Sequence, residues 1–249
     1  MTIGYQITGN GPVRLLMLHG WLSDQGIYDG IMPWFDPAKY TVARMDYRGY
    51  GRSRGMKGDY SIAEIAKDAL GLADSLGWNS FHVLGHSMGG MVVQKMALMA
   101  PDKVISGIAV APVPASGFEM DDGTREFFES SADDDAALTE IFNILTGQRH
   151  APAVLEALTR SARSATTRAA YLGYLTAWTQ TDFAADVAQI KMPVTVIAGA
   201  KDGALGPEVM ENSYMKQLGN SRLKIIDAAG HYPMLETPPE FFSLIEAGL

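Results

Sequence analysis

Short apolar segments recur along the chain, separated by polar or turn-forming residues. Two of them, VRLLML at 13–18 and PVTVIA at 193–198, are typical of strands buried on both faces of a sheet. Further strands are predicted at 3–8, 41–45, 81–84, 104–110 and 222–226. Helical spacing of apolar residues is found at 61–76, 87–100 and 207–218, and in a last helix from Thr237. This alternation predicts an α/β fold, a mostly parallel central sheet flanked by helices.

Two of the predicted helices carry signals for their ends. Ser61 and Glu64 form a capping box at the start of one helix, and Gly77 is expected to end it. The last helix opens with a second capping box, from Thr237 to Glu240, with proline at its first position.

The strand–helix alternation stops between residues 112 and 186. Proline and glycine residues open this segment, and helical patterns without a strong strand follow them. The sequence therefore predicts a helical lid at 112–186, inserted before the last two strands. Residues 1–111 and 187–249 are then expected to form the core.

An aromatic stripe on the predicted lid has two interpretations. Tyr171, Tyr174 and Trp178 are spaced i, i+3 and i+7, which places them on one face of a helix. In the first interpretation they pack the lid onto the core, and in the second they line the roof of a substrate pocket. One aromatic face can do both.

Composition and charge narrow the class of protein. The chain has 249 residues, of which 47% are hydrophobic and 19% charged, as is ordinary for a compact globular protein. Its net charge is −8 and it has no basic cluster, so nucleic acid is not an expected partner. The absence of cysteine excludes a thiol nucleophile, disulfides and cysteine-bound metal sites. Without a visible secretory signal or an apolar stretch of about 20 residues, a cytoplasmic protein with no membrane span is expected.

The segment from Gly85 to Gly90, GHSMGG, follows a predicted strand and precedes a helical pattern. A strand that turns tightly into a helix holds the residue at the apex in strained geometry, and glycines beside it avoid clashes across the turn. Ser87 at this apex is predicted to be a nucleophile. A second G-x-S-x-G match surrounds Ser53, but polar residues precede it and glycines follow it, which predicts a loop.

A serine hydroxyl needs a base to take its proton, and the chain has five histidines. His231 lies in the loop between the last predicted strand and the last helix. Loops at the carboxyl ends of parallel strands share one edge of the sheet, so His231 and Ser87 are expected to meet there. His82 lies within a strand and points into the sheet layer. His231 is therefore predicted to be the general base and acid.

The base needs a carboxylate to fix its tautomer and to stabilise the imidazolium. Asp202 directly follows the strand at 193–198, on the same edge of the sheet. Asp227, at the end of the last strand, is the alternative. We expect Asp202 to be the acid.

Two backbone amides are expected to stabilise the developing oxyanion, each worth about 10²–10³ in rate. Met88 follows the nucleophile at the N-terminus of the new helix, where the helix dipole adds positive potential. Trp21 follows Gly20 in the loop after the strand at 13–18. The Trp21 ring is also a candidate wall of the substrate pocket, with core packing as the alternative.

Four motifs, in this order, carry a resemblance to the α/β-hydrolase family. They are LHGW at 18–21, DYRGYGRS at 46–53, GHSMGG at 85–90, and GAKD at 199–202 with GH at 230–231. Over nearly its whole length the chain resembles the small-lidded esterases and lactonases of this family. The short N-terminal part has room for one leading strand, so seven strands are expected rather than eight.

The motifs and the resemblance together predict a carboxylesterase or lactonase that forms an acyl-enzyme at Ser87. The aromatic lid favours a small or medium apolar molecule as substrate, and no metal or organic cofactor is implied. Three alternatives stay open. The same residues serve perhydrolysis, haloperoxidase-like chemistry or carbon–carbon bond hydrolysis; they transfer the acyl group to an alcohol or amine; or the fold acts as a ligand receptor.

Overall fold

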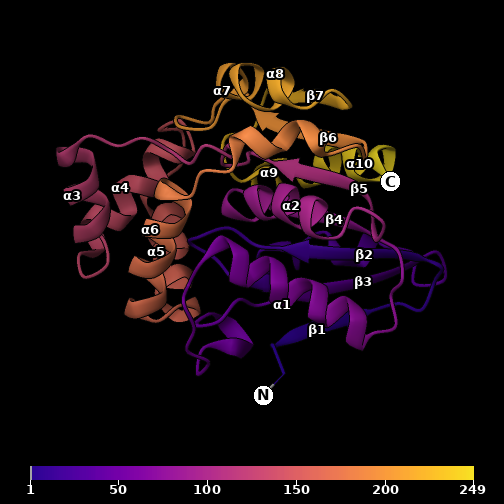
Figure 1. Cartoon of the computed structure of the whole chain (residues 1–249). Helices are drawn as coiled ribbons and strands as arrows, with labels where there is room; N and C mark the ends of the chain where they lie inside the picture. The colour runs from indigo at the N-terminus through magenta and orange to yellow at the C-terminus, as the bar shows by residue number, and fades with distance from the viewer. Residues whose placement is uncertain (1) are drawn as a thin grey trace.

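A seven-stranded sheet forms the centre of the computed structural model, which describes residues 2–249 (Figure 1). The strands are β1 (Tyr5–Thr8), β2 (Val13–Leu18), β3 (Tyr40–Met45), β4 (Phe81–His86), β5 (Val104–Val110), β6 (Val194–Gly199) and β7 (Ser221–Ile226). They lie in the order β1-β3-β2-β4-β5-β6-β7. β1 pairs antiparallel with β3, and the other neighbours pair in parallel. The predicted fold class and the seven-stranded sheet are confirmed.

The register brings the carboxyl ends of the parallel strands to one edge of the sheet. Leu18 pairs with Gly85 where β2 and β4 end, and Gly199 pairs with Ile226 where β6 and β7 end. Every residue of β6 is buried, because helices cover both faces of the sheet. The segments that follow these strands therefore start side by side.

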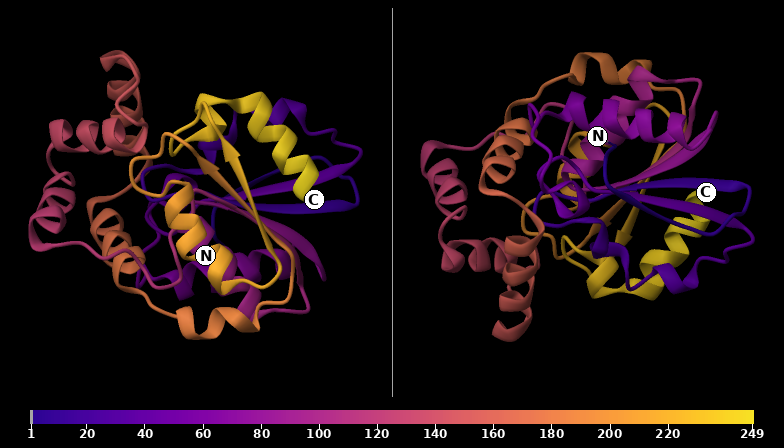
Figure 2. Two further views of the ribbon diagram at one scale, coloured as in Figure 1. Left: turned by 90° about the horizontal axis from the view of Figure 1, so that it is seen from above. Right: turned by 90° about the horizontal axis from the view of Figure 1, so that it is seen from below.

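Helices flank the sheet on both faces. They are α1 (Ile62–Ser75), α2 (Met88–Met99), α7 (Pro207–Asn212), α8 (Tyr214–Gln217), α9 (Pro233–Glu236) and α10 (Pro238–Gly248). Figure 2 shows α10 on the opposite side of the sheet from α1 and α2. Four short 3-10 helices complete this part: η1 (Gln25–Tyr28), η2 (Met32–Trp34), η3 (Gly51–Ser53) and η4 (Ala184–Gln189).

Four helices lie between β5 and β6, beyond the carboxyl ends of the strands (Figures 1 and 2). They are α3 (Asp122–Ser130), α4 (Asp135–Leu145), α5 (Pro152–Ala165) and α6 (Arg168–Gln180). An isolated bridge between Tyr50 and Thr166 joins this group, which we call the lid, to the rest of the chain. The helices lie within residues 112–186, and the division of the chain at those limits stays a prediction.

The signals at the ends of α1 are largely confirmed. The Ser61 hydroxyl accepts a hydrogen bond from the Glu64 amide at 3.1 Å, and Gly77 adopts a φ of 70° just after the helix. The Glu64 carboxylate does not complete the box, since it accepts the amides of Asp59 and Tyr60 instead.

The second capping box is wrong. Thr237 makes no side-chain cap for α10, because its hydroxyl turns back to the Pro233 carbonyl of the preceding helix α9. The helix predicted at 207–218 is also interrupted: it divides at Ser213, whose hydroxyl donates to Val209 O at 2.6 Å. Short-range sequence patterns predicted neither the missing cap at Thr237 nor the division of the helix at Ser213.

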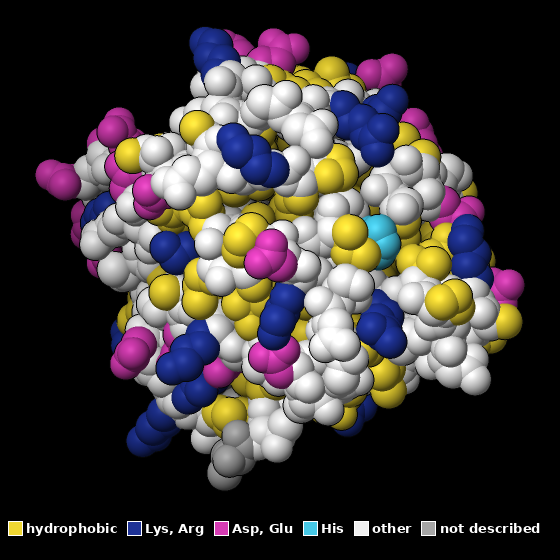
Figure 3. All heavy atoms as spheres, turned by 45° about the vertical axis from the view of Figure 1, so that its right-hand side comes forward, with side chains coloured by type: hydrophobic (Ala, Val, Ile, Leu, Met, Phe, Trp, Pro, Cys, Tyr) yellow, Lys and Arg dark blue, Asp and Glu magenta, His cyan; other side chains and the backbone are white. Residues whose placement is uncertain are grey.

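No helix of residues 2–249 is both long enough and apolar enough to cross a membrane. The face of the molecule in Figure 3 carries basic, acidic and apolar side chains interspersed, and neither charge gathers there into a continuous patch.

Candidate active site

Ser87 occupies the sharp turn between β4 and α2. Its φ of 55° and ψ of −118° are strained for a residue with a side chain. The turn is possible because the residues beside it are glycines: a Cβ at Gly85 would lie 2.1 Å from Gly89 O, and one at Gly89 would lie 2.7 Å from His19 O. The Ser87 amide donates to Val110 O at 2.8 Å, which ties the turn to the end of β5.

His231 lies in the loop between β7 and α9, paired with Asp202 from the loop after β6. Its Nδ1–H donates to Asp202 Oδ2 at 2.7 Å, so the neutral ring leaves Nε2 as an acceptor. The other oxygen of Asp202 accepts the amides of Ala204 and Leu205 at 2.9 and 3.0 Å. The side chains of His231 and Asp202 are 4% and 0% exposed, whereas the alternative acid Asp227 is exposed. Of these two carboxylates, Asp202 is the one that is hydrogen-bonded to His231.

His86 connects the serine turn to the His231 loop. Its Nε2 donates to the His231 carbonyl at 2.9 Å, and the two rings lie 4.8 Å apart. Burial, together with nearby His231, holds the pKa of His86 well below its usual value. A neutral His86, the residue directly before Ser87, therefore connects the serine turn to the histidine loop through this hydrogen bond.

Ser87 and His231 line the same cavity, which has a volume of about 510 Å³. Within residues 2–249 no hydrogen bond joins the Ser87 hydroxyl to the His231 ring. Ser87 itself is buried, with 9% of its surface exposed. Bonds between a nucleophile and its base are commonly long before substrate binds. The two side chains share one cavity.

The cavity walls are mainly apolar and aromatic. The lining residues outside the Ser87 and His231 turns are Trp21, Leu22, Val113, Phe118, Gly123, Thr124, Phe127, Phe128, Ile144, Leu145, Trp178, Gly203, Ala204 and Leu205. No Lys, Arg, Asp or Glu of the described residues lines it. The lid helix α3 contributes Gly123, Thr124, Phe127 and Phe128 to one wall, and its two adjacent phenylalanines are the local sequence signal for this wall.

The two predicted oxyanion donors flank the Ser87 turn. Met88 is the first residue of α2, and Trp21 lies in the loop after β2. In the described part of the chain neither backbone amide donates a hydrogen bond, so both are free to receive one acceptor. Glycine at position 20 allows the loop after β2 to pack closely against the serine turn, because a Cβ there would lie 2.7 Å from His86 Nδ1. Trp21 lines the cavity, whereas the side chain of Met88 is buried outside it.

The three aromatic residues of α6 do not all have the same surroundings. Trp178 lines the cavity beside Trp21, with ring centroids 5.6 Å apart. Tyr171 and Tyr174 lie outside the cavity lining, which favours the packing interpretation for these two residues. The Tyr171 hydroxyl bonds Ser131 at 2.6 Å. Tyr174 is fully buried and packs against aromatic rings of the core. Helical spacing placed all three residues on one helix face. In the structure Tyr171 and Tyr174 pack inside the protein, and only Trp178 reaches the cavity.

The remaining serine and histidine candidates have structural partners. Ser53 accepts the Gly4 amide at 2.7 Å. His19 donates to Gly20 O at 2.7 Å, and His82 bonds Ser106 at 2.7 Å. No group of three metal-ligating side chains in residues 2–249 is placed to hold a metal ion.

A family model described as alpha/beta hydrolase fold matches residues 13–238. The chain belongs to the alpha/beta-hydrolase family. This alpha/beta hydrolase is similar to a pimeloyl-[acyl-carrier protein] methyl ester esterase from Nitrosomonas europaea, with 29% identity over 257 residues that cover 99% of each chain. The relatives are named esterases, which supports an alpha/beta-hydrolase enzyme.

Solved structures show the same fold for this alpha/beta hydrolase. Est816, an N-acyl homoserine lactone degrading enzyme, superposes with a TM-score of 0.86 at 24% identity, covering 99% of this chain and 96% of that one. A bromoperoxidase from Bacillus anthracis superposes with a TM-score of 0.87 at 23% identity, covering 98% and 93%. Since both are under 25% identical, they establish the fold and leave the reaction to the site itself.

Proposed function

We propose that this alpha/beta hydrolase cleaves carboxylic esters or lactones with an apolar acyl part, through Ser87, His231 and Asp202. The observation that carries the proposal is the pairing of a strained serine turn with a buried His231–Asp202 pair around one cavity. A ligand receptor would need neither the strained serine nor the buried pair. The named esterases among the relatives agree with this reaction class.

In the proposed reaction, Ser87 Oγ attacks the carbonyl carbon while His231 Nε2 takes the hydroxyl proton. Asp202 stabilises the imidazolium that forms, and the negative carbonyl oxygen accepts the amides of Trp21 and Met88. Collapse of this intermediate breaks the carbon–oxygen bond, and His231 returns the proton to the leaving alkoxide. Water then attacks the acyl-enzyme with His231 again as base, which releases the acid and restores Ser87.

The cavity favours a neutral acyl group. No Lys, Arg, Asp or Glu among residues 2–249 lines its walls, so a charged acyl terminus would lose hydration without gaining a partner. Trp21, Trp178 and Phe128 offer flat apolar surface to a chain or ring of small or medium size. The Nitrosomonas relative is named for a methyl ester whose acyl part is carried on an acyl-carrier protein.

A substrate panel with two variants tests the proposal. It contains p-nitrophenyl esters of graded acyl length, methyl octanoate, a γ-lactone and a peroxide-dependent bromination assay. We expect ester or lactone turnover by the wild-type enzyme, loss of at least about 10³-fold in Ser87→Ala, and no such loss in Ser53→Ala. A fluorophosphonate probe should label the wild type and not Ser87→Ala.

Two results would contradict the proposal. Probe labelling that persists in Ser87→Ala would remove the nucleophile. Bromination or perhydrolysis that exceeds hydrolysis at equal enzyme would replace ester hydrolysis with the peroxide reaction.

A further inference from the structure

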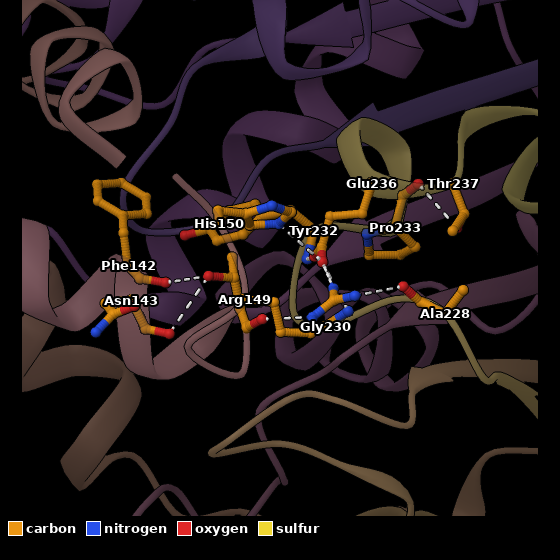
Figure 4. Close-up of polar contacts among 11 residues, drawn as sticks. Phe142, Asn143, Arg149, His150, Ala228, Gly230, Tyr232, Pro233, Glu236 and Thr237 are labelled. Carbon is orange, nitrogen blue, oxygen red and sulfur yellow. Dashed lines mark hydrogen bonds and ion pairs between the residues drawn. The ribbon is translucent and has the colours of Figure 1, made fainter. Parts of the chain in front are cut away.

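A buried glutamate holds the chain on both sides of His231. The carboxylate of Glu236, in α9, is 4% exposed (Figure 4). Its Oε2 accepts the Gly230 amide at 3.0 Å and its Oε1 accepts the Tyr232 amide at 2.9 Å. The two oxygens therefore clamp the residues immediately before and after His231.

The same carboxylate contacts an arginine and a histidine from the lid segment between α4 and α5. The Arg149 guanidinium pairs with Oε2, and His150 Nε2 lies 3.3 Å from the same oxygen (Figure 4). Arg149 also donates to Ala228 O in the histidine loop and to Thr146 O at the end of α4, both at 2.8 Å. One arginine thus connects the lid, the histidine loop and Glu236.

Further contacts join the lid to this loop. The His231 amide donates to Leu145 O at 3.0 Å, at the last residue of α4. A Cβ at Gly230 would lie 2.9 Å from Thr146 Cα, so the two segments are in close contact. The backbone position of His231 is therefore set by Glu236 and by the end of α4 together.

A carboxylate this deeply buried is stable only when its charge and lone pairs are satisfied. Glu236 meets this condition with two amides, Arg149 and His150. Its neutral isostere glutamine has one oxygen and one NH2 group. The NH2 group would face one of the two amides, donor against donor, and that side of the clamp would open.

We propose that Glu236 is a positioning residue for His231, and that Arg149 couples this positioning to the lid. This inference rests on the proposed function, in which His231 moves protons to and from Ser87. Proton transfer depends steeply on distance, and displacement by about 1 Å can cost 10²-fold in rate. Glu236 acts through the loop backbone and does not contact the substrate cavity.

The test compares Glu236→Gln with Glu240→Gln, a matched control at an exposed glutamate in the first turn of α10. We expect Glu236→Gln to lower kcat by about 10- to 100-fold with KM changed by less than about threefold, because the pocket is intact and the base is displaced. Fluorophosphonate labelling of Ser87 should slow by a similar factor. Glu240→Gln should match the wild type in all three measurements.

Two further measurements keep the test decisive. Hydrogen exchange at residues 228–236 should be faster in Glu236→Gln than in Glu240→Gln, and this readout does not depend on turnover. If Glu236→Gln does not fold, Arg149→Met decides, with an expected loss of about 3- to 10-fold in kcat at similar KM.

The outcomes separate the two proposals. Folded Glu236→Gln, or Arg149→Met in its place, with wild-type kcat would overturn the positioning role, as would unchanged exchange at 228–236. A wild-type enzyme that neither turns over esters nor reacts with the probe would overturn the proposed function alone, and exchange would still report on the clamp.

Discussion

The nucleophile end and the base end of the proposed triad are held in different ways, although both line one cavity. The Ser87 turn is held mainly by steric exclusion, since the turn from β4 to α2 leaves no room for a side chain at Gly85. His231 is held by distant segments: Asp202 lies in the loop after β6, and Leu145 ends a lid helix.

The difference separates two physical means of placing a side chain. Steric exclusion sets the nucleophile end, and it operates as soon as the strand and helix pack. A polar network sets the base end, and it depends on every partner being present. Substitutions at the base end should therefore reduce activity more than stability, and substitutions at the nucleophile turn should reduce stability as well.

The sharpest test of the base end is Asp202→Asn. Asparagine keeps an oxygen for the amides of Ala204 and Leu205 but presents NH2 to His231, which favours the wrong tautomer of the ring. We expect kcat for ester hydrolysis to fall by about 10³–10⁴-fold. The control Asp227→Asn, at an exposed position, should keep wild-type kcat. The reverse pattern would move the acid to Asp227.

The nucleophile end is tested by Gly85→Ala. A Cβ there would lie 2.1 Å from a backbone oxygen, and backbone cannot move aside as a flexible side chain does. We expect the free energy of unfolding to fall by about 4 kcal/mol or more in chemical denaturation. Gly71→Ala is the matched control: it lies in α1 with open space around it, and alanine should stabilise the helix by up to about 1 kcal/mol. Equal stability of the two variants would contradict the steric account.

The sequence predicts what local patterns determine. Apolar segments located all seven described strands to within two residues at each end. The central strands are apolar because they are buried on both faces, whereas the edge strands β1 and β7 are partly exposed. The turn at Ser87 was predictable since its glycines are neighbours in the chain. Asp202 and His231 followed from parallel topology, which brings strand ends to one edge.

Contacts between distant segments were not predictable in the same way. Helical spacing placed Tyr171, Tyr174 and Trp178 on one face, but it does not say which part of that face meets the core. The link from Glu236 to the lid was missed because Arg149 lies 87 positions away along the chain. No local pattern reports such a pair.

The lid helix α6 contributes both to core packing and to the cavity wall, and a pair of substitutions in this helix separates the two roles. Tyr174→Ala removes a fully buried ring and should lower the free energy of unfolding by about 3 kcal/mol. Trp178→Ala enlarges the cavity and should shift the preferred acyl length upward, with a smaller loss of stability. Activity across graded p-nitrophenyl esters and thermal unfolding measure the two effects. A shift in chain length in Tyr174→Ala alone would return Tyr174 to the pocket.

The smallest expected effect concerns His86, which lies between the two ends. Burial lowers the pKa of His86, and also those of His19 and His82, below the usual value of 6.5. These rings are neutral in the native state, whereas the unfolded chain takes up their protons below about pH 6.5. The unfolded state then binds more protons, so the free energy of unfolding falls as the pH drops below 6.5 and is unaffected by these groups above it.

Each such histidine contributes up to about 1.4 kcal/mol per pH unit to this slope. Urea denaturation of the wild type between pH 7.5 and 5.5 should show the loss, and His86→Gln should show a slope smaller by one proton. The absolute stability of His86→Gln will also change, because the bond to His231 O is altered, so the slope is the quantity to compare. A slope identical to that of the wild type would mean that His86 binds its proton equally in both states. In that case His86 would not be a neutral brace between the serine turn and the histidine loop.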